Sequence, residues 1–378
     1  FVFSGWTGVN LGQAGITGTR NELSALSFIM VEGLELQANF IPTPFPTLAA
    51  VYHGILEPEG TVDHLTTGHL SLNLTTTGTF TGTLRQGGGT HPVNGLLSTT
   101  GDARFGTTRA SSLIINRRNL PALEVAISMD FADAPRRMTA TVVQLGERSS
   151  GILGRDHFST TNKVPAEYAG TTSQRYHFIT VNNPAGNVGV PLNQYPQGHS
   201  ACSLMLSASG DVTCAGTLAD GTTFTASGPL WENLNFPLYT PLYANQGCFA
   251  SLIQLDTTPA NTDLTGQYVL WLRPQQSGAQ WYRDGWPAGL DVNLLGTKYT
   301  VPPSTALIAG ATPANPTTGH LGLSFSDGLL TAPITKGVNI STTQVITRAP
   351  TTDTSFTASL VRTTGILSGT FTHTDLTK

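Results

Sequence analysis

Charged residues are scarce in this chain of 378 residues. They make up 11% of the sequence, and the formal net charge is −4, whereas soluble domains usually contain about 25% charged residues. No basic cluster exceeds the pairs Arg117-Arg118 and Arg136-Arg137. Because nucleic-acid binding needs a concentrated basic patch, we expect no nucleic-acid partner.

Cysteines and long apolar runs are also scarce. The sequence has 3 cysteines, Cys202, Cys214 and Cys248, all in its central part. Cys202 and Cys214 flank one predicted hairpin and are the candidate disulfide, with three buried thiols as the alternative. The most apolar early run, residues 23–36, is interrupted by two glutamates and a glycine. It is too short to cross a bilayer, so we expect no membrane span.

No segment sustains the i, i+3, i+4, i+7 apolar spacing of an amphipathic helix. The chain instead carries short apolar and β-branched runs separated by turns centred on glycine. Residues 198–249 show this design best, with turns at Ser209-Gly210-Asp211 and Asp220-Gly221. The pattern predicts an all-β fold of antiparallel meander repeats closed into β-barrel or sandwich-like units. One single large barrel is the alternative architecture.

The same design recurs around residues 68–88 and 319–337, so we predict related units along the chain. The repeat spacing is too irregular for a solenoid. We divide the sequence into four parts. These are an N-terminal strand segment with a Pro-rich linker (1–49) and three β meander units (50–160, 161–256 and 257–378).

Several strings carry a resemblance to a known family. They include GHLSLNLTTTGTFTGTL, CAGTLADGTTFTASG, FPLYTPLYANQGCFASLIQL, LTGQYVLWLRP, DVNLLGTKYTVPP and TTGILSGTFTH. Their residues and their order along the chain resemble a β-rich repeat domain of very large secreted and surface proteins of verrucomicrobial and planctomycete bacteria. The resemblance covers residues 50–378. It implies an extracellular or cell-surface location and adhesive use, and it brings no catalytic residues to carry over.

The two ends of the chain suggest how copies associate. The sequence opens on Phe1 without a basic segment and an apolar core, so we expect a secreted protein whose signal peptide has been removed. The strand-like start is a candidate strand donor, through Phe1, Val2, Phe3 and Trp6. Its acceptor would be an unpaired edge at residues 369–374, because the resembling domains continue with closing strands there, whereas this chain stops at Lys378. Donation within one chain would give a closed monomer, and donation to a neighbouring copy would give a filament or layer.

No constellation of residues predicts catalysis. Residues 198–202, GHSAC, resemble the G-x-S-x-G nucleophile elbow, but Cys202 replaces the final glycine and no helix is predicted to follow. The equivalent histidines His69, His199 and His320 could meet at a metal only around a pseudo-threefold axis. We therefore expect no enzyme, no cofactor and no metal site.

One aromatic segment has the residue types of a binding site. Between residues 271 and 286, aromatic and charged side chains alternate in a loop that contains glycine and proline. The candidate glycan or interface contacts are Trp271, Trp281, Tyr282, Arg283, Asp284 and Trp286. A sugar ring can stack on an indole while neighbouring polar groups bind its hydroxyls. Tryptophans that cap the open end of a core are the alternative.

These observations predict a non-enzymatic extracellular structural or adhesive surface protein. We expect it to associate with itself or with other surface proteins, and to assemble into a filament or layer by strand addition. The alternative is a carbohydrate-binding module that uses the loop from Trp271 to Trp286.

Overall fold

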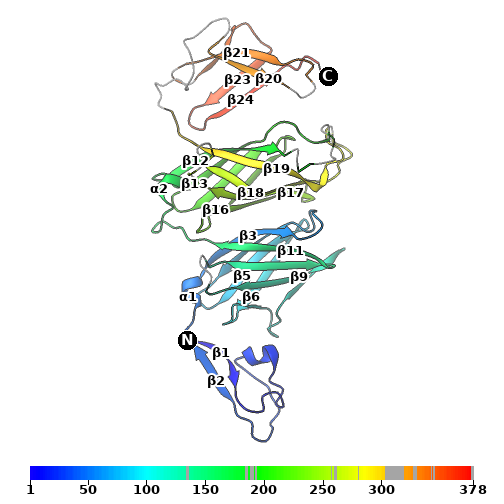
Figure 1. Cartoon of the computed structure of the whole chain (residues 1–378), viewed down its shortest axis with the longest axis vertical. Coiled ribbons are helices and arrows are strands. Elements are labelled where there is room, and N and C mark those ends of the chain that lie inside the picture. The colour runs from blue at the N-terminus through cyan, green and yellow to red at the C-terminus, as the bar shows by residue number, and fades with distance from the viewer. Residues whose placement is uncertain are drawn as a thin grey trace.

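The computed structural model shows an elongated stack of β units, with the N-terminus in the lowest part and the last strands at the opposite end (Figure 1). It describes residues 1–132, 136–183, 186–187, 191, 194–256, 258, 262–279, 281–302, 319–326, 330–341, 343 and 345–375. All ladders between its strands are antiparallel, and two large sheets curl into barrel-like units. The predicted all-β fold is confirmed.

An N-terminal lobe precedes the first barrel. Strand β1 (Val2–Thr7) pairs with β2 (Gln37–Ile41), and the chain between them contains the 3-10 turn η1 (Gly18–Glu22). Arg104 of the first barrel donates hydrogen bonds of 2.6 Å and 2.7 Å to the two carboxylate oxygens of Glu22. This bidentate ion pair ties the lobe to the barrel.

The Pro-rich stretch that we predicted to be a linker differs from that expectation. It forms the short helix α1 (Phe45–Leu48), and the side chains of Phe45 and Leu48 are buried in the core of the first barrel. Because two large apolar side chains leave water there, this stretch is a plug for the barrel rather than a spacer.

The first barrel is a sheet of nine strands. Its strands are β3 (Ala50–Pro58), β4 (Gly68–Leu74), β5 (Thr79–Gln86), β6 (Gly89–Leu97), β7 (Ala103–Arg104), β8 (Leu113–Arg117), β9 (Leu120–Met129), β10 (Met138–Gln144) and β11 (Glu147–Arg155). Their order in the sheet is β7-β6-β5-β4-β3-β11-β10-β9-β8, so the first long strand pairs with the last. An isolated bridge between Asp102 and Ser128 brings the two edges together.

The second barrel repeats this plan with eight strands. Its elements are α2 (Ala166–Ala169), β12 (Ser173–Asn182), β13 (Ala201–Ser207), β14 (Asp211–Thr217), β15 (Thr223–Pro229), β16 (Asn235–Leu242), β17 (Gly247–Leu255), β18 (Leu264–Arg273) and β19 (Trp286–Tyr299). The sheet order is β15-β14-β13-β12-β19-β18-β17-β16. We placed a unit boundary between residues 256 and 257, but β18 and β19 complete this barrel, so the boundary falls after Tyr299.

Short turns explain why the repeated motif folds alike in each unit. Gly78, Gly210 and Gly365 follow β4, β13 and β23 (Phe356–Val361), and each has a positive φ, of 84°, 91° and 71°. Glycine adopts this backbone conformation without a steric penalty, so each turn sends the next strand straight back. On either side of the turns, alternate apolar residues such as Leu70, Leu72 and Leu74 point into the core.

The C-terminal unit has two smaller sheets. Strands β20 (Leu321–Phe325), β21 (Ile334–Ile340) and β22 (Ile346–Ala349) form one, and β23 pairs with β24 (Ile366–Phe371) in the other. All six residues of β24 are exposed. Among the described residues β24 has β23 as its one strand neighbour, so one edge of β24 lies unpaired.

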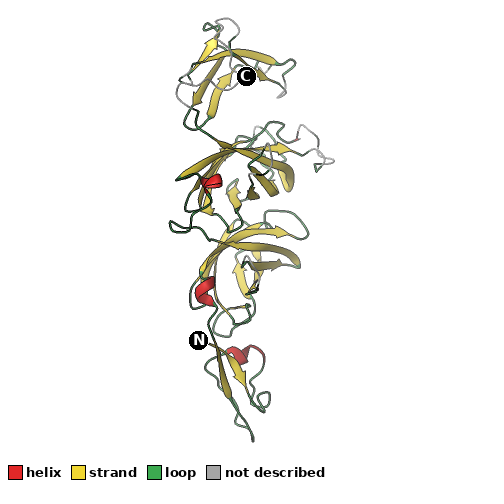
Figure 2. Cartoon of the chain, turned by 60° about the vertical axis from the view of Figure 1, so that its left-hand side comes forward, coloured by secondary structure: helices red, strands yellow, loops and turns green. Residues whose placement is uncertain are grey.

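The two barrels pack side against side, and Figure 2 shows them aligned along the long axis. Asp156 forms an isolated bridge with Trp231, which lies in the tight loop between β15 and β16. The Trp231 ring covers Gly154 so closely that a Cβ on that glycine would lie 1.9 Å from it. Only glycine fits at this point of the junction.

The cysteine prediction is wrong in its pairing. Cys202, Cys214 and Cys248 are free thiols and all are buried. In the β13–β14 ladder Cys202 faces Gly216 and Cys214 faces Leu204, so the two sulfurs occupy diagonal positions. Diagonal Cα atoms lie about 7–8 Å apart, beyond the reach of a disulfide. Burial raises the pKa of the Cys202 thiol to about 11 and also raises that of Cys214, so both thiols are protonated at neutral pH.

Within the described ranges, no helix is long and apolar enough to cross a membrane.

Candidate functional site

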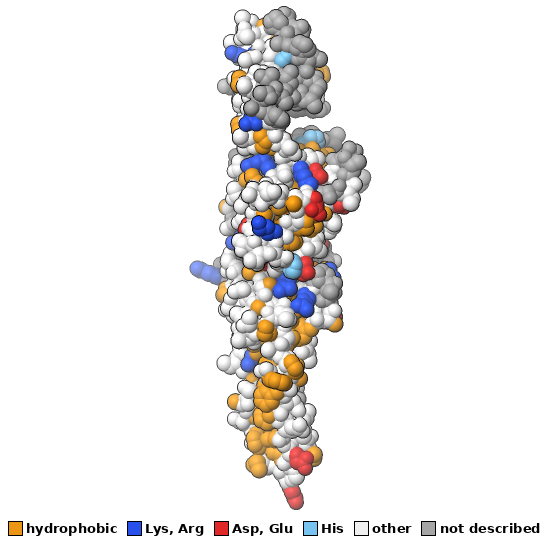
Figure 3. All heavy atoms as spheres, turned by 90° about the vertical axis from the view of Figure 1, so that its left-hand side faces the viewer, with side chains coloured by type: hydrophobic (Ala, Val, Ile, Leu, Met, Phe, Trp, Pro, Cys, Tyr) orange, Lys and Arg blue, Asp and Glu red, His pale blue; other side chains and the backbone are white. Residues whose placement is uncertain are grey.

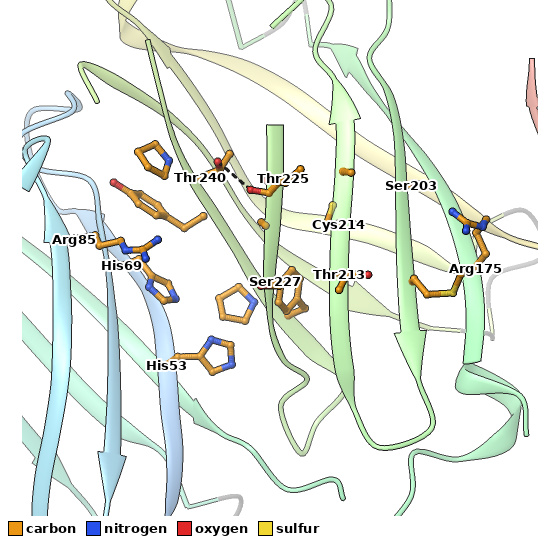
Figure 4. A pocket seen from close by; sticks show the side chains of 17 residues that line it. His53, His69, Arg85, Arg175, Ser203, Thr213, Cys214, Thr225, Ser227 and Thr240 are labelled. Atoms are coloured by element: carbon orange, nitrogen blue, oxygen red, sulfur yellow. Dashed lines mark hydrogen bonds between the residues drawn. The ribbon is translucent and has the colours of Figure 1, made fainter. Parts of the chain in front are cut away.

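A cleft of about 730 Å³ opens where the two barrels meet. Its lining comes from β3, β4 and β5 of the first barrel and from β12 to β16 of the second (Figure 4). His53, His69 and Arg85 form one wall, and Arg175 lies at the far end of the opposite wall (Figure 4). Ligand sites favour such concave junctions between domains.

Two prolines explain why the second barrel stays open beside this cleft. Strand β16 keeps a continuous register with β17 from Asn235 to Leu242. Its prolines at 237 and 241, which have no N–H, therefore occupy positions whose backbone groups point away from β17 and toward β15. These missing donors disfavour a regular ladder between β15 and β16, which are the two edges of the sheet. One side-chain hydrogen bond of 3.5 Å, from Thr240 Oγ1 to the Thr225 carbonyl, spans the gap. All four residues line the cleft.

The charged side chains that line the cleft are all positive. Arg85 and Arg175 line it, and no aspartate or glutamate among the described residues does. Hydroxyls of Ser203, Thr213 and Ser227 supply much of the remaining polar lining. An anion in the cleft would thus meet two guanidinium groups and no opposing carboxylate.

Two neutral histidines line the wall contributed by the first barrel. His53 is 3% exposed, and its Nε2 donates to the Pro229 carbonyl at 2.8 Å. Burial lowers the pKa of His53 to about 4. The His69 ring stacks on Tyr239 with the ring centres 5.8 Å apart, and burial, with His53 and Arg85 nearby, lowers its pKa too. Both imidazoles are therefore uncharged at neutral pH.

The structure separates the residues of the predicted aromatic site. Trp271 is 1% exposed and Trp286 is 5% exposed, and both belong to the core of the second barrel, whereas Trp281 is 52% exposed. Tyr282 packs on Trp286 with the ring centres 5.9 Å apart. The alternative interpretation, that the tryptophans cap a core, is the one the structure supports for Trp271 and Trp286.

The two charged residues of that loop do not complete a binding surface. Arg283 is exposed and donates through Nε to the Ala279 carbonyl at 2.9 Å. Asp284 lies exposed in the turn before β19. These contacts shape the loop and leave Trp281 without a second exposed indole beside it.

A buried ion pair that the sequence did not reveal organises this end of the barrel. Arg273 Nη1 lies 3.1 Å from Asp220 Oδ2, and both side chains are almost fully buried. Asp220 also accepts a 2.8 Å hydrogen bond from the Tyr243 hydroxyl, which in turn accepts one of 2.9 Å from Trp271 Nε1. The Arg273 guanidinium lies over the rings of Tyr243, Tyr282 and Trp286. This network joins the turn before β15 to the turn after β16, across the open seam.

The predicted strand donor is already part of a hairpin. Val2, Phe3 and Trp6 lie in β1, which pairs with β2 of the same lobe, and Phe1 is exposed just before it. Phe3 packs on Trp6, with ring centres 5.5 Å apart. The segment is therefore no detached arm, although β1 keeps one edge unpaired among the described strands.

The three repeated histidines do not meet. His69 lies at the barrel junction, His199 is exposed, and His320 accepts a 2.9 Å hydrogen bond from the Ile340 N–H in the C-terminal unit. In the part of the chain that the structure describes, no three His, Cys, Asp or Glu side chains lie where they could hold a metal ion.

Comparisons with known proteins add little. No protein-family description matches the sequence, and no curated protein does. A solved structure with some similarity is a protein of unknown function from the DUF3598 family of Nostoc punctiforme. It is 11% identical, the alignment covers 68% of this chain and 97% of that chain, and the TM-score is 0.18. A likeness at that TM-score supports no statement about fold or function.

Sequence reasoning missed the residues that line the cleft. His53, Arg85, Arg175 and Tyr239 are far apart in the sequence and meet only when β3–β5 pack beside β12–β16. The available signal was the pair of prolines in an otherwise strand-like run, because prolines there mark an edge strand and so an opening in the sheet.

Proposed function

We propose that this protein is a non-enzymatic structural and adhesive component of an extracellular surface, built as a stack of β units. The carrying observation is the packed junction between the barrels. There the Trp231 ring rests on Gly154, and the backbone bridge at Asp156 joins the two units. Backbone and ring contacts together fix the orientation of one barrel relative to the other. A protein that acts as a rigid spacer on a surface needs such a fixed junction.

The chemistry of the outer faces supports this proposal. Only 11% of the residues are charged. Outward positions of β5 carry Thr79 and Thr81, and Thr139 is an exposed position of β10. Small hydroxyl side chains make a strand surface that can contact water or a neighbouring polar surface. Because they carry no charge, they create no strong electrostatic field there.

The two ends of the stack suggest self-association with a second copy of the chain. Figure 3 shows hydrophobic side chains gathered over the N-terminal end. Ile29, Met30 and Phe40 of that lobe are each more than half exposed. At the other end, β24 has one edge without a partner among the described strands, and Leu367 on it is half exposed.

Strand addition would join these ends. The free edge of β1 in one copy adds to the free edge of β24 in the next, so the β1–β2 hairpin need not open. Main-chain hydrogen bonds provide the affinity, and the exposed apolar side chains add buried area. Such a contact joins two different surfaces, so it does not close on itself and produces a filament or layer.

Sedimentation velocity over a concentration series tests this assembly on the full chain. We expect the wild type to form species that grow with concentration, and Leu367→Lys to remain monomeric, since lysine on an edge strand opposes pairing. Leu145→Lys is the matched control, because Leu145 is equally apolar, is 84% exposed and lies in the β10–β11 turn, away from both ends. A wild type that stays monomeric at its solubility limit, or an equal effect of both variants, contradicts strand addition at β24.

A further inference from the structure

We propose that the cleft between the two barrels binds a segment of an acidic polysaccharide, held through its carboxylate or sulfate groups. This inference does not depend on self-assembly, because the cleft lies at the barrel junction and not at either end of the stack (Figures 1 and 4).

Charge is the first argument. Arg85 extends from the outer face of β5 and Arg175 from β12, and they lie on opposite sides of the cleft (Figure 4). Within the described ranges neither guanidinium has a hydrogen bond or an ion pair. In the part of the chain that the structure describes no carboxylate lines the cleft, although the whole chain has a net charge of −4. Two free guanidinium groups placed apart in an acidic protein fit an extended ligand with repeated negative charges better than one small anion.

Shape is the second argument. On β13, β14 and β15 the inward positions carry large core side chains such as Leu204 and Phe224. The outward positions that line the cleft include Ser203, Ala215 and Thr225. Apart from Met205, the side chains at the outward positions of these three strands that line the cleft are small, so they leave a hollow between Arg175 and the wall of the first barrel. A linear chain of sugar rings fits such a hollow.

The polar groups of the cleft suit sugar hydroxyls. Serine and threonine hydroxyls can both donate and accept hydrogen bonds, and Tyr239 is also part of the lining. The Tyr239 ring is fixed by its stack on His69, with 5.8 Å between ring centres. A wall that is already ordered loses little side-chain entropy when a ligand binds.

A nucleic-acid strand also carries repeated negative charges, but the cleft fits it less well. Binding to nucleic acid relies on many neutralised phosphates and on bases stacked on exposed aromatic faces. Two arginines line this cleft, and one face of Tyr239 is occupied by His69. A polysaccharide with spaced charges and many hydroxyls matches the lining better.

Isothermal titration calorimetry on the full chain at low salt tests the proposal. The probes are polygalacturonate for carboxylates, dextran sulfate for sulfates, and unmodified dextran of similar length. We expect at least one acidic polymer to bind and dextran not to bind. We expect Arg85→Gln and Arg175→Gln each to weaken binding by about tenfold, the usual worth of one charge-assisted hydrogen bond.

Two further variants separate the cleft from general charge effects. Arg118→Gln removes the same charge from an exposed turn between β8 and β9 and is expected to leave binding unchanged. Ser227→Trp fills the cleft at an exposed position and is expected to abolish binding, with circular dichroism and thermal unfolding confirming that the variant is folded.

Four outcomes would overturn the proposal. They are no binding of either acidic polymer, equal binding of dextran, equal weakening by Arg118→Gln and Arg85→Gln, and stronger binding of single-stranded DNA with the same arginine dependence. The carboxylate and sulfate probes, compared on the same variants, decide which acidic group the two arginines recognise.

Discussion

Acidification is expected to destabilise the barrel junction through His53. The neutral ring donates from Nε2 to the Pro229 carbonyl, so a second proton must go to Nδ1, which has no hydrogen-bond partner among the described residues. The groups around the ring are the Trp231 and His69 rings, with centres at 6.2 Å and 5.9 Å, and Arg85 lies on the far side of His69. Burial of the ring outweighs the hydrogen bond to the Pro229 carbonyl, so a proton on His53 is disfavoured in the folded protein.

The size of the effect follows from the pKa of His53. Burial lowers this pKa from 6.5 to about 4. A depressed histidine pKa means that the unfolded chain binds the proton more tightly than the folded protein does. The contribution of the neutral His53 ring to the free energy of unfolding is therefore present in full well above pH 6.5. It is lost as the pH drops from 6.5 toward 4. Between pH 7.5 and pH 5 the loss amounts to about 2 kcal/mol, at 1.36 kcal/mol for each pKa unit.

Urea unfolding at pH 7.5 and pH 5.0 measures this loss. His53→Gln keeps a donor for the Pro229 carbonyl but cannot take up a proton, so it should lose about 2 kcal/mol less than the wild type on acidification. His199→Gln is the control, because His199 is exposed. If the wild type and His53→Gln show the same difference between the two pH values, the assignment of acid sensitivity to this ring is refuted.

Two other substitutions probe the packing directly. Gly154→Ala places a Cβ 1.9 Å from the Trp231 ring, so we expect a loss of about 1–3 kcal/mol in urea unfolding. Gly198→Ala, where a Cβ meets nothing within 4 Å, should change stability little, and equal losses in both variants would contradict the close packing. Arg273→Met leaves Asp220 buried without its partner, and we expect a loss of about 3–5 kcal/mol. Arg273→Met combined with Asp220→Asn should recover part of that loss, and tryptophan fluorescence during unfolding would show whether it does.

The local structure was predictable because it depends on near neighbours in the sequence. The glycine turns at residues 78 and 210 and the alternation around Leu70 and Leu72 appear in the sequence as they do in the fold. Alternation reveals which side chains face inward, since successive residues of a strand point to opposite faces. It does not reveal which strand lies next to which.

Long-range pairing explains what the sequence could not show. Strand β12 pairs with β19, with Arg175 opposite Tyr299, so the two halves of the sheet join across a separation in the sequence that no local pattern records. That pairing moved the unit boundary beyond β19 and buried Trp271 and Trp286 inside the barrel. The Pro-rich stretch misled for a similar reason, because Phe45 is buried by strands that follow it in the chain.

The pairing of first and last strands has a consequence for how such a protein can change in length. His53 lies opposite Gly154 in the first barrel, and Arg175 lies opposite Tyr299 in the second, so the chain enters and leaves each barrel at neighbouring points. The strands of each barrel therefore form one continuous segment of the chain whose two ends lie close together. Duplication or loss of a whole barrel needs only one new join in the chain, and it leaves the hydrogen-bond ladders of the remaining barrels intact. A gene encoding this design can lengthen or shorten its product by whole units.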